Sequence, residues 1–273
     1  PKGSGLSSSA AFEVLLGTML NELLWERHCT PVELAQIGQY AENMFFGKPC
    51  GLMDQTASSV GGVVAIDFAD TVHPIVERLD VDLHTCGYAL CILDSGAGHE
   101  DLTGEYSAIT EELRAVCRVF GKEVLREVPE EAFLAELPQV RKAVGDRAVN
   151  RAFHVYGENR RVREEVQALR SGDFQRFLTL VRESGRSSAM YLQNIIPTGS
   201  TAAQELMVTI ALCERMLEGR GAVRVHGGGF GGTAQAFVPL DMLDGFRDRV
   251  EASLGRGCCH VVRIRPAGGI RLG

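Results

Sequence analysis

The sequence has no excess of positive charge. Its 28 lysine and arginine residues are outnumbered by 35 aspartate and glutamate residues, which gives a net charge of −7 over 273 residues. Proteins that bind nucleic acids neutralise phosphates with clustered basic side chains, so this balance argues against a nucleic-acid partner. The sequence also shows no signal peptide and no apolar run long enough to cross a bilayer, and we therefore expect no membrane partner.

Paired cysteines are missing as well. None of the eight cysteines stands in a Cys-x-x-Cys pair, so their spacing matches neither a zinc knuckle nor a compact disulfide scaffold. Several lie within apolar runs, where cysteine behaves as a small hydrophobic residue. This usage is typical of a reducing compartment, and we expect a cytoplasmic protein.

An initiator methionine is also absent, and Pro1 already lies inside a motif. We therefore interpret the chain as a fragment whose upstream portion is missing. With 45% hydrophobic and 23% charged residues, its composition is that of an ordinary globular protein. Its length allows one large domain or two modest ones.

A glycine- and serine-rich run from Pro1 to Ala11 opens the chain. Gly3 and Gly5 allow the backbone to approach a ligand closely, and the serines stand where a helix would begin. Unpaired N–H groups and the helix dipole make such a terminus a natural anion site. This run alone fits a phosphate cradle and an ordinary serine-capped helix equally well, and it does not match the P-loop pattern.

The first predicted helix runs from Ser9 to Trp25, because apolar residues recur there at helical spacing. We expect this apolar face to be buried. It consists of Phe12, Leu15, Leu16, Met19, Leu20, Leu23 and Leu24. A second helix begins at the capping box Thr30-Pro31-Val32-Glu33.

A third, shorter helix is predicted over residues 52–60 and a strand over residues 63–68. The polar passage from residue 69 to residue 85 is the expected domain boundary. We therefore divide the chain into residues 1–85 and residues 86–273.

The second half shows a strand at residues 88–94, then mostly helical sequence from residue 102 to residue 192 with breaks near Pro129, Pro138 and Ser171-Gly172. The remaining predicted elements are a helix over 201–217, strands over 222–225 and 233–238, a helix over 242–254 and a strand over 260–264. This order predicts an α+β sandwich with helices on one face of a mainly antiparallel sheet.

Two acidic residues are candidates for chemistry. Asp54 lies in the first turn of the third predicted helix, where the helix dipole favours an ionised carboxylate that could accept a hydroxyl proton. A simple helix-capping role is the alternative. Glu42 could be a metal ligand, although an ordinary surface glutamate is the default interpretation.

The run His226-Gly227-Gly228-Gly229-Phe230-Gly231-Gly232 could form a second backbone wall over phosphates or the oxyanion element of an esterase. The esterase is excluded because the chain has no Gly-x-Ser-x-Gly nucleophile elbow. A hairpin turn alone needs fewer glycines. A dinucleotide fingerprint fits poorly, because this run leads into a strand and not into a helix.

Together, three ordered motifs resemble those of one kinase superfamily. Pro1-x-Gly3-x-Gly5-Leu6-Ser7-Ser8-Ser9-Ala10 resembles the phosphate-binding motif of the GHMP small-molecule kinases, and the run from Gly227 to Gly232 resembles their third motif. Glu42-Asn43, followed by Cys50-Gly51-Leu52-Met53-Asp54-Gln55, resembles galactokinases in particular. The resemblance extends from Pro1 through Arg265.

This resemblance implies the GHMP kinase two-domain α+β fold. Residues 1–85 would be the remainder of a ribosomal-protein-S5-like, ATP-binding N-terminal domain. Residues 86–273 would be a ferredoxin-like α/β-sandwich C-terminal domain. The upstream motif of galactokinases, with an arginine near the transferred phosphate and residues that hold the sugar, is not present in this chain.

The resemblance also implies roles for individual residues. Asp54 matches the catalytic base that takes the proton from the sugar C1 hydroxyl, and Gly51, Asp54 and Tyr106 match positions that contact the sugar. Mg²⁺ is implied at Ser9 and Glu42. The residues matching the ATP-binding loop are Gly3, Ser4, Gly5, Leu6, Ser7, Ser8 and Ser9, and those supporting it are Gly228, Gly229 and Gly231. A helical core aromatic is the alternative for Tyr106.

The implied activity is ATP- and Mg²⁺-dependent phosphorylation of galactose to galactose 1-phosphate by a monomeric enzyme, with the fragment by itself inactive. The alternatives are another sugar-1-kinase, for N-acetylgalactosamine or arabinose, and a galactokinase-like sensor that binds sugar and ATP without turnover. The intact Ser9-Ala10 pair favours the enzyme. A third interpretation, an NAD-dependent oxidoreductase, is supported by the glycine content only.

Overall fold

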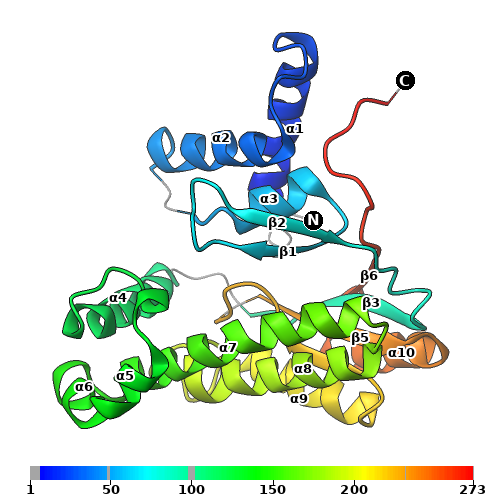
Figure 1. The fold of residues 1–273 in the computed structure, drawn as a ribbon. Coiled ribbons are helices and arrows are strands. Elements are labelled where there is room, and N and C mark those ends of the chain that lie inside the picture. The colour runs from blue at the N-terminus through cyan, green and yellow to red at the C-terminus, as the bar shows by residue number, and fades with distance from the viewer. Residues whose placement is uncertain (1–6, 48–49, 98–101, 231, 273) are drawn as a thin grey trace. The chain divides into compact units, whose positions relative to one another are not determined.

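The structure is a computed structural model that describes residues 7–47, 50–97, 102–230 and 232–272. The chain divides into two compact units, which we describe separately (Figure 1). Unit 1 consists of residues 1–82 and 263–273, and unit 2 consists of residues 83–262. The sequence placed the boundary after residue 85 and assigned the last eleven residues to the second domain.

The described residues of unit 1 form three helices and a two-stranded antiparallel sheet. The helices lie on one side of this sheet (Figure 1). The helices are α1 (Ser8–Leu23), α2 (Pro31–Met44) and α3 (Met53–Val60), and the strands are β1 (Val63–Asp67) and β2 (Ile75–Leu79). The predicted capping box at the start of α2 is present. The backbone N–H of Glu33 donates to Thr30 Oγ1 at 3.2 Å, and the backbone N–H of Thr30 donates to Glu33 Oε2 at 2.7 Å.

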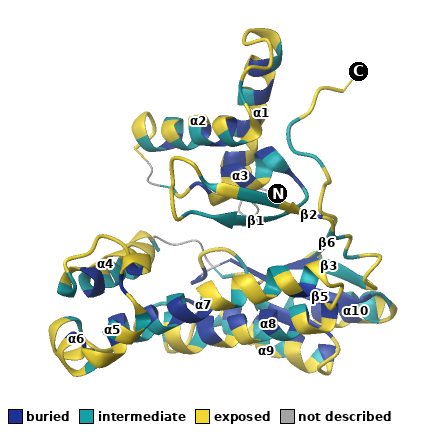
Figure 2. Cartoon of the chain, in the orientation of Figure 1, coloured by how far each residue is buried: buried dark blue, intermediate teal, exposed yellow. Residues whose placement is uncertain are grey.

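The apolar face predicted for α1 is exposed, so the expectation that it is buried was wrong. Leu23 is 74% exposed and Phe12 is 61% exposed, and the other members of the face are at least 42% exposed (Figure 2). The opposite side of the helix is buried, through Ala10, Val14 and Thr18. α1 packs with that side against α2 and α3. The short side chains of Ala10 and Val14 allow a close approach.

The last residues of the chain return to unit 1. The backbone N–H of Gly62 donates to the carbonyl of Arg265 at 2.8 Å. A Cβ at Gly268 would lie 1.8 Å from the carbonyl oxygen of Ser59, and one at Gly269 would lie 2.1 Å from Thr18 Oγ1. Only glycine fits such close contacts, so these two positions let the C-terminal segment pack tightly on α1 and α3.

Unit 2 is built on a four-stranded antiparallel sheet with the order β4-β5-β3-β6. The strands are β3 (Tyr88–Asp94), β4 (Ala222–Val225), β5 (Thr233–Pro239) and β6 (Cys259–Val262). This confirms the predicted antiparallel α+β arrangement. The connection from β4 to β5 is the glycine-rich run from His226 to Gly232.

Helices cover both faces of this sheet rather than one. α9 (Glu205–Leu217) and α10 (Leu243–Leu254) share a core with the face that carries Cys91 and Ala236. α8 (Phe174–Ser187) packs on the face that carries Leu90 and Phe237. The prediction that helices cover only one face of the sheet was wrong. Side chains on both faces of β5 are buried, as expected for a strand in a sheet that is covered on both sides.

The remaining helices of unit 2 form a second core around α7. They are α4 (Thr103–Val119), α5 (Glu130–Ala135), α6 (Leu137–Val144) and α7 (Asp146–Arg170), with a short 3₁₀ turn at Leu125–Glu127. A second 3₁₀ turn, Leu240–Met242, precedes α10 and packs with the sheet core. A single π-helical turn, Ser188–Leu192, continues α8. The three predicted breaks are present. The break near Pro138 lies at Glu136, between the end of α5 and the start of α6, and Pro138 itself lies in the first turn of α6, where proline is tolerated.

Candidate functional site

The start of α1 and the start of α3 meet at a direct hydrogen bond. The hydroxyl of Ser7 donates to Asp54 Oδ2 at 2.6 Å, across 47 residues of sequence. Ser7 stands immediately before α1 in the left-handed region, with φ of 51°, and its side chain makes no capping hydrogen bond to that helix. The hydroxyl is therefore used between the two segments and not as an ordinary helix cap.

Asp54 likewise is not a capping residue. It is the second residue of α3, whose N-cap position is Leu52, and no side chain caps this helix. The carboxylate of Asp54 is exposed and lies next to the unpaired N–H groups of the first turn of α3. Two alternatives from the sequence are therefore disfavoured: that a serine side chain caps α1, and that Asp54 caps α3.

Glu42 is buried and only 4% exposed, which excludes the default interpretation of a surface glutamate. Its carboxylate accepts a hydrogen bond from Gln55 Nε2 at 3.1 Å, and the same amide donates to Glu13 Oε2 at 3.3 Å. Gln55 also reaches Cys50 Sγ at 3.5 Å. Burial and the neighbouring Glu42 raise the pKa of the Cys50 thiol to about 11, so this thiol stays protonated at neutral pH.

The predicted metal ligands do not form a closed metal centre. Across the described ranges, no group of three or more histidine, cysteine, aspartate or glutamate side chains could hold a metal ion. Ser9 is exposed in the first turn of α1. Magnesium in kinases is bound by one or two protein oxygens together with substrate phosphates, so a hydroxyl and one carboxylate match that donor chemistry.

In unit 2, Tyr106 contacts the glycine-rich turn between β4 and β5. Its hydroxyl donates to the carbonyl of Gly229 at 2.9 Å. Its ring packs edge-on against Phe230, with centroids 5.5 Å apart. A Cβ at Gly228 would lie 2.6 Å from the Tyr106 ring, so glycine is required there. Tyr106 is 41% exposed and is therefore not a core aromatic residue.

Asn194, which no sequence motif marks, also holds this turn. Asn194 Nδ2 donates to the carbonyl of Gly228 at 3.1 Å, and its own backbone carbonyl accepts from the N–H of Phe230 at 2.6 Å. A Cβ at Gly229 would lie 2.0 Å from that carbonyl oxygen. The sequence around Asn194 carries no motif, so only the folded chain reveals the contact.

Several predicted site residues remain without a described contact. Gly3, Ser4, Gly5 and Leu6 lie outside the described residues, as does Gly231. Gly51 is exposed, and a Cβ there would meet no atom within 4 Å. Ser8 is exposed on α1.

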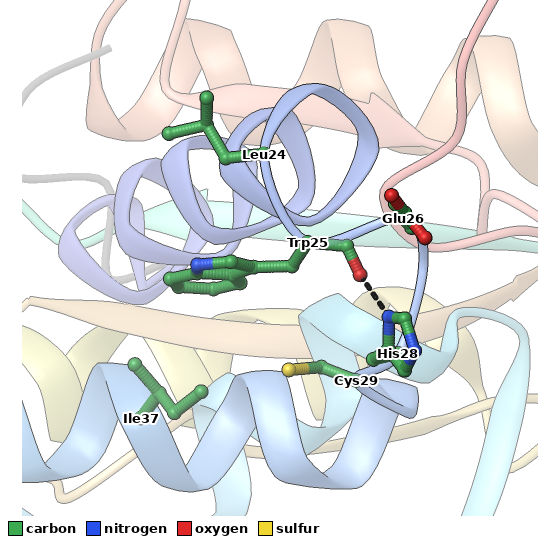
Figure 3. Close-up of a pocket in the computed structure, with 6 residues that line it drawn as sticks. All are labelled: Leu24, Trp25, Glu26, His28, Cys29 and Ile37. Carbon is green, nitrogen blue, oxygen red and sulfur yellow. Dashed lines mark hydrogen bonds between the residues drawn. The ribbon is translucent and has the colours of Figure 1, made fainter.

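A pocket of about 550 Å³ lies at the far end of α1 and contains none of the predicted site residues (Figure 3). Its lining residues are Leu24, Trp25, Glu26, His28, Cys29 and Ile37. His28 Nδ1 lies 2.5 Å from the carbonyl oxygen of Trp25. The lining is mostly apolar and borders the exposed face of α1.

Among the described residues, no helix is long and apolar enough to cross a membrane. Residues 1–62 match the model of the GHMP kinases N terminal domain. The chain is 33% identical over 247 residues to a galactokinase of Glaesserella parasuis and 34% identical over 253 residues to one of Actinobacillus pleuropneumoniae. Each alignment covers 90% of this chain and 61% of the relative. The chain therefore spans about three fifths of the length of these relatives.

Solved structures show the same similarity. The crystal structure of Lactococcus lactis galactokinase complexed with galactose matches with a TM-score of 0.77 and 27% sequence identity. That match covers 100% of this chain and 69% of the other. The mevalonate kinase of L. major, in complex with R-mevalonate, matches with a TM-score of 0.61 and 16% identity, which supports the fold alone.

Proposed function

Because the chain belongs to the GHMP kinase superfamily, we propose that its protein transfers the γ-phosphate of ATP to the C1 hydroxyl of galactose. The observation that carries the proposal is the 2.6 Å hydrogen bond between Ser7 and Asp54. It brings the end of the phosphate-loop motif to the carboxylate expected to receive the proton. The galactokinase relatives and the galactose complex of the Lactococcus lactis enzyme support the choice of sugar.

The start of α1 supplies the proposed phosphate contact. Its first N–H groups have no partners within the helix, and the helix dipole adds positive potential at the same point. Ser8 and Ser9 add hydroxyl groups in the first turn. Phosphoryl transfer depends mainly on positioning and on neutralising charge, which these groups can supply without covalent chemistry.

Asp54 is the proposed base. An exposed carboxylate can accept a hydrogen bond from the attacking hydroxyl and collect its proton late, as a loose transition state permits. The hydroxyl of Ser7 fixes Oδ2, so the other oxygen of the carboxylate is the one that would bind the sugar hydroxyl. Gly51 and Tyr106 are the other proposed sugar contacts, and Gly228, Gly229 and Gly231 the proposed support of the phosphate loop.

Magnesium would be held by Ser9 and Glu42 together with the ATP phosphates. When bound, the ion would neutralise charge on the transferred phosphate. The buried Glu42 carboxylate is oriented by Gln55 Nε2 at 3.1 Å, which is the outer-shell support typical of a metal-binding carboxylate. We propose a monomeric protein of the cytoplasm.

A coupled ADP-release assay on the complete polypeptide encoded by its gene tests the proposal. The panel should contain galactose, N-acetylgalactosamine, arabinose and glucose, each with ATP and Mg²⁺. The proposal predicts the highest kcat/KM for galactose. A higher value for another sugar would reassign the substrate. Binding of ATP and galactose without ADP release would identify a sensor, and binding of NAD in place of ATP would point to an oxidoreductase.

A further inference from the structure

We infer that Asn194 is a positioning residue that fixes the glycine turn between β4 and β5. The turn contains four residues with positive φ among those described, Gly227 at 65°, Gly229 at 87°, Phe230 at 61° and Gly232 at 113°. Phe230 has a side chain and adopts this conformation at an energetic cost. Such a turn keeps its shape only when its surroundings hold it.

Asn194 holds the turn at two successive peptide groups. Its side-chain Nδ2 donates to the Gly228 carbonyl at 3.1 Å, and its backbone carbonyl accepts from the Phe230 N–H at 2.6 Å. Tyr106 holds the carbonyl of Gly229, between these two points. Three consecutive residues of the turn are therefore each tied by one hydrogen bond.

The side-chain amide of Asn194 can hold the turn because its Nδ2 group is a hydrogen-bond donor. The residue is 2% exposed, so water cannot replace the contact with Gly228. Its Oδ1 is buried without a hydrogen-bond partner, and only the Nδ2 donor satisfies the turn. An aspartate would have the same shape but would direct a second acceptor at the Gly228 carbonyl.

Asn194 is itself fixed by the segment that carries it. This segment follows the π-helical turn Ser188–Leu192 through Gln193, which has a φ of 57°. The carbonyl of Leu192 accepts from Arg151 Nε at 3.1 Å, and Arg151 is 1% exposed. The turn is therefore tied, through Asn194, to a segment that the buried Arg151 holds.

The functional consequence rests on the proposed kinase activity, in which this turn supports the phosphate loop. If Asn194 fixes the turn, its loss should raise KM for ATP and leave KM for galactose nearly unchanged. We expect a rise of about tenfold, the usual effect of one lost hydrogen bond to a buried acceptor.

The test compares Asn194→Asp with Asn159→Asp in the complete polypeptide. Asn159 lies exposed on α7, so the control makes the same change of charge away from the turn. Hydrogen exchange of peptides covering residues 226–233 is measured with the kinetics. Exchange should accelerate at this turn in Asn194→Asp only, and KM for ATP should rise in that variant only.

Lowering the pH should partly restore the Asn194→Asp variant, which would not happen if Asn194 acted only through packing. Burial raises the pKa of an introduced carboxyl group, and its protonated form regains a donor toward the Gly228 carbonyl. Between about pH 8 and about pH 5.5, the Asn194→Asp defect relative to Asn159→Asp should therefore shrink. Tyr106 and His226 are titratable groups at the turn. Burial raises the pKa of Tyr106 from 10.0, so it stays neutral, and His226 is common to both variants.

Each outcome decides the inference. Faster exchange at the turn, a higher KM for ATP and recovery at low pH support it. Equal exchange in the two variants at every pH overturns it, whatever the kinetics show. If the wild-type polypeptide has no sugar kinase activity, the proposed function fails, and the exchange data still decide whether Asn194 fixes the turn.

Discussion

The substitution Glu112→Gln should destabilise unit 2 strongly. Arg151 is 1% exposed and donates from Nη1 to Glu112 Oε2 at 2.8 Å. Burial lowers the pKa of Arg151, and the charge of Glu112 opposes this effect. Removing the carboxylate charge would leave a buried guanidinium without a counter-ion.

The expected cost is about 3–5 kcal/mol, the usual effect of breaking a buried ion pair by removing one partner. Arg147 also binds Glu112, from Nε at 2.9 Å, but its side chain is 39% exposed. The substitution Arg147→Ala should therefore cost no more than about 1 kcal/mol. Replacing both partners, in Glu112→Gln with Arg151→Met, should recover part of the loss, because no buried charge is then left unpaired.

Urea denaturation followed by circular dichroism at 222 nm measures these differences. Fluorescence of Trp25, the one tryptophan in the sequence, follows unit 1 separately and serves as an internal control. A loss of less than about 1 kcal/mol in the free energy of unfolding of Glu112→Gln would refute this prediction. So would a double variant that is clearly less stable than Glu112→Gln, because the two substitutions would then act as separate defects.

Two further predictions concern stability and surface. Burial, together with nearby Glu158, raises the pKa of Glu165 from 4.5 to about 7, so the folded chain keeps a proton that the unfolded chain releases. The stability contributed by this group is complete below about pH 4.5 and is lost as the pH rises through about 7. Glu165→Gln should therefore raise the free energy of unfolding by about 1–3 kcal/mol at about pH 8 and change it little at about pH 4, in urea titrations at both pH values. Replacing Leu16 and Leu20, 43% and 42% exposed, by lysine should reduce binding of an apolar fluorescent dye to the 273-residue chain without lowering its unfolding midpoint; a lower midpoint would show that both side chains pack.

Local patterns predicted most of the elements of this fold. The capping box at Thr30 identified the start of α2, and a short apolar run identified β3. β2 was missed because the segment Ile75–Leu79 contains Glu77 and Arg78 within a polar passage. Its pairing with β1, which local sequence does not encode, makes it a strand.

The burial of α1 could not be predicted by periodicity alone. The sequence shows an apolar face, but its burial depends on which neighbour covers it. In unit 1, α2 and α3 pack against the side with Ala10 and Val14 instead. Small side chains contribute little to an apolar pattern, and so this packing surface has a weak sequence signal.

The candidate site was predicted in its composition but not in its contacts. The motifs indicated Ser7, Asp54, Glu42 and Tyr106 as functional residues. The hydrogen bond from Ser7 to Asp54 joins segments 47 residues apart, and Asn194 binds a glycine 34 residues away. Such pairs follow from tertiary structure, which residue spacing does not reveal.

The central claim is that Asp54 receives the proton of the attacking sugar hydroxyl. Its most direct test is galactose-dependent ADP release by the complete polypeptide and by its Asp54→Ala variant, with ATP binding measured in parallel by calorimetry. The account predicts that Asp54→Ala lowers kcat by at least about a hundredfold, the usual contribution of a general base, while the Kd for ATP changes by less than about threefold. Turnover close to that of the wild type would contradict the assignment of Asp54 as the base.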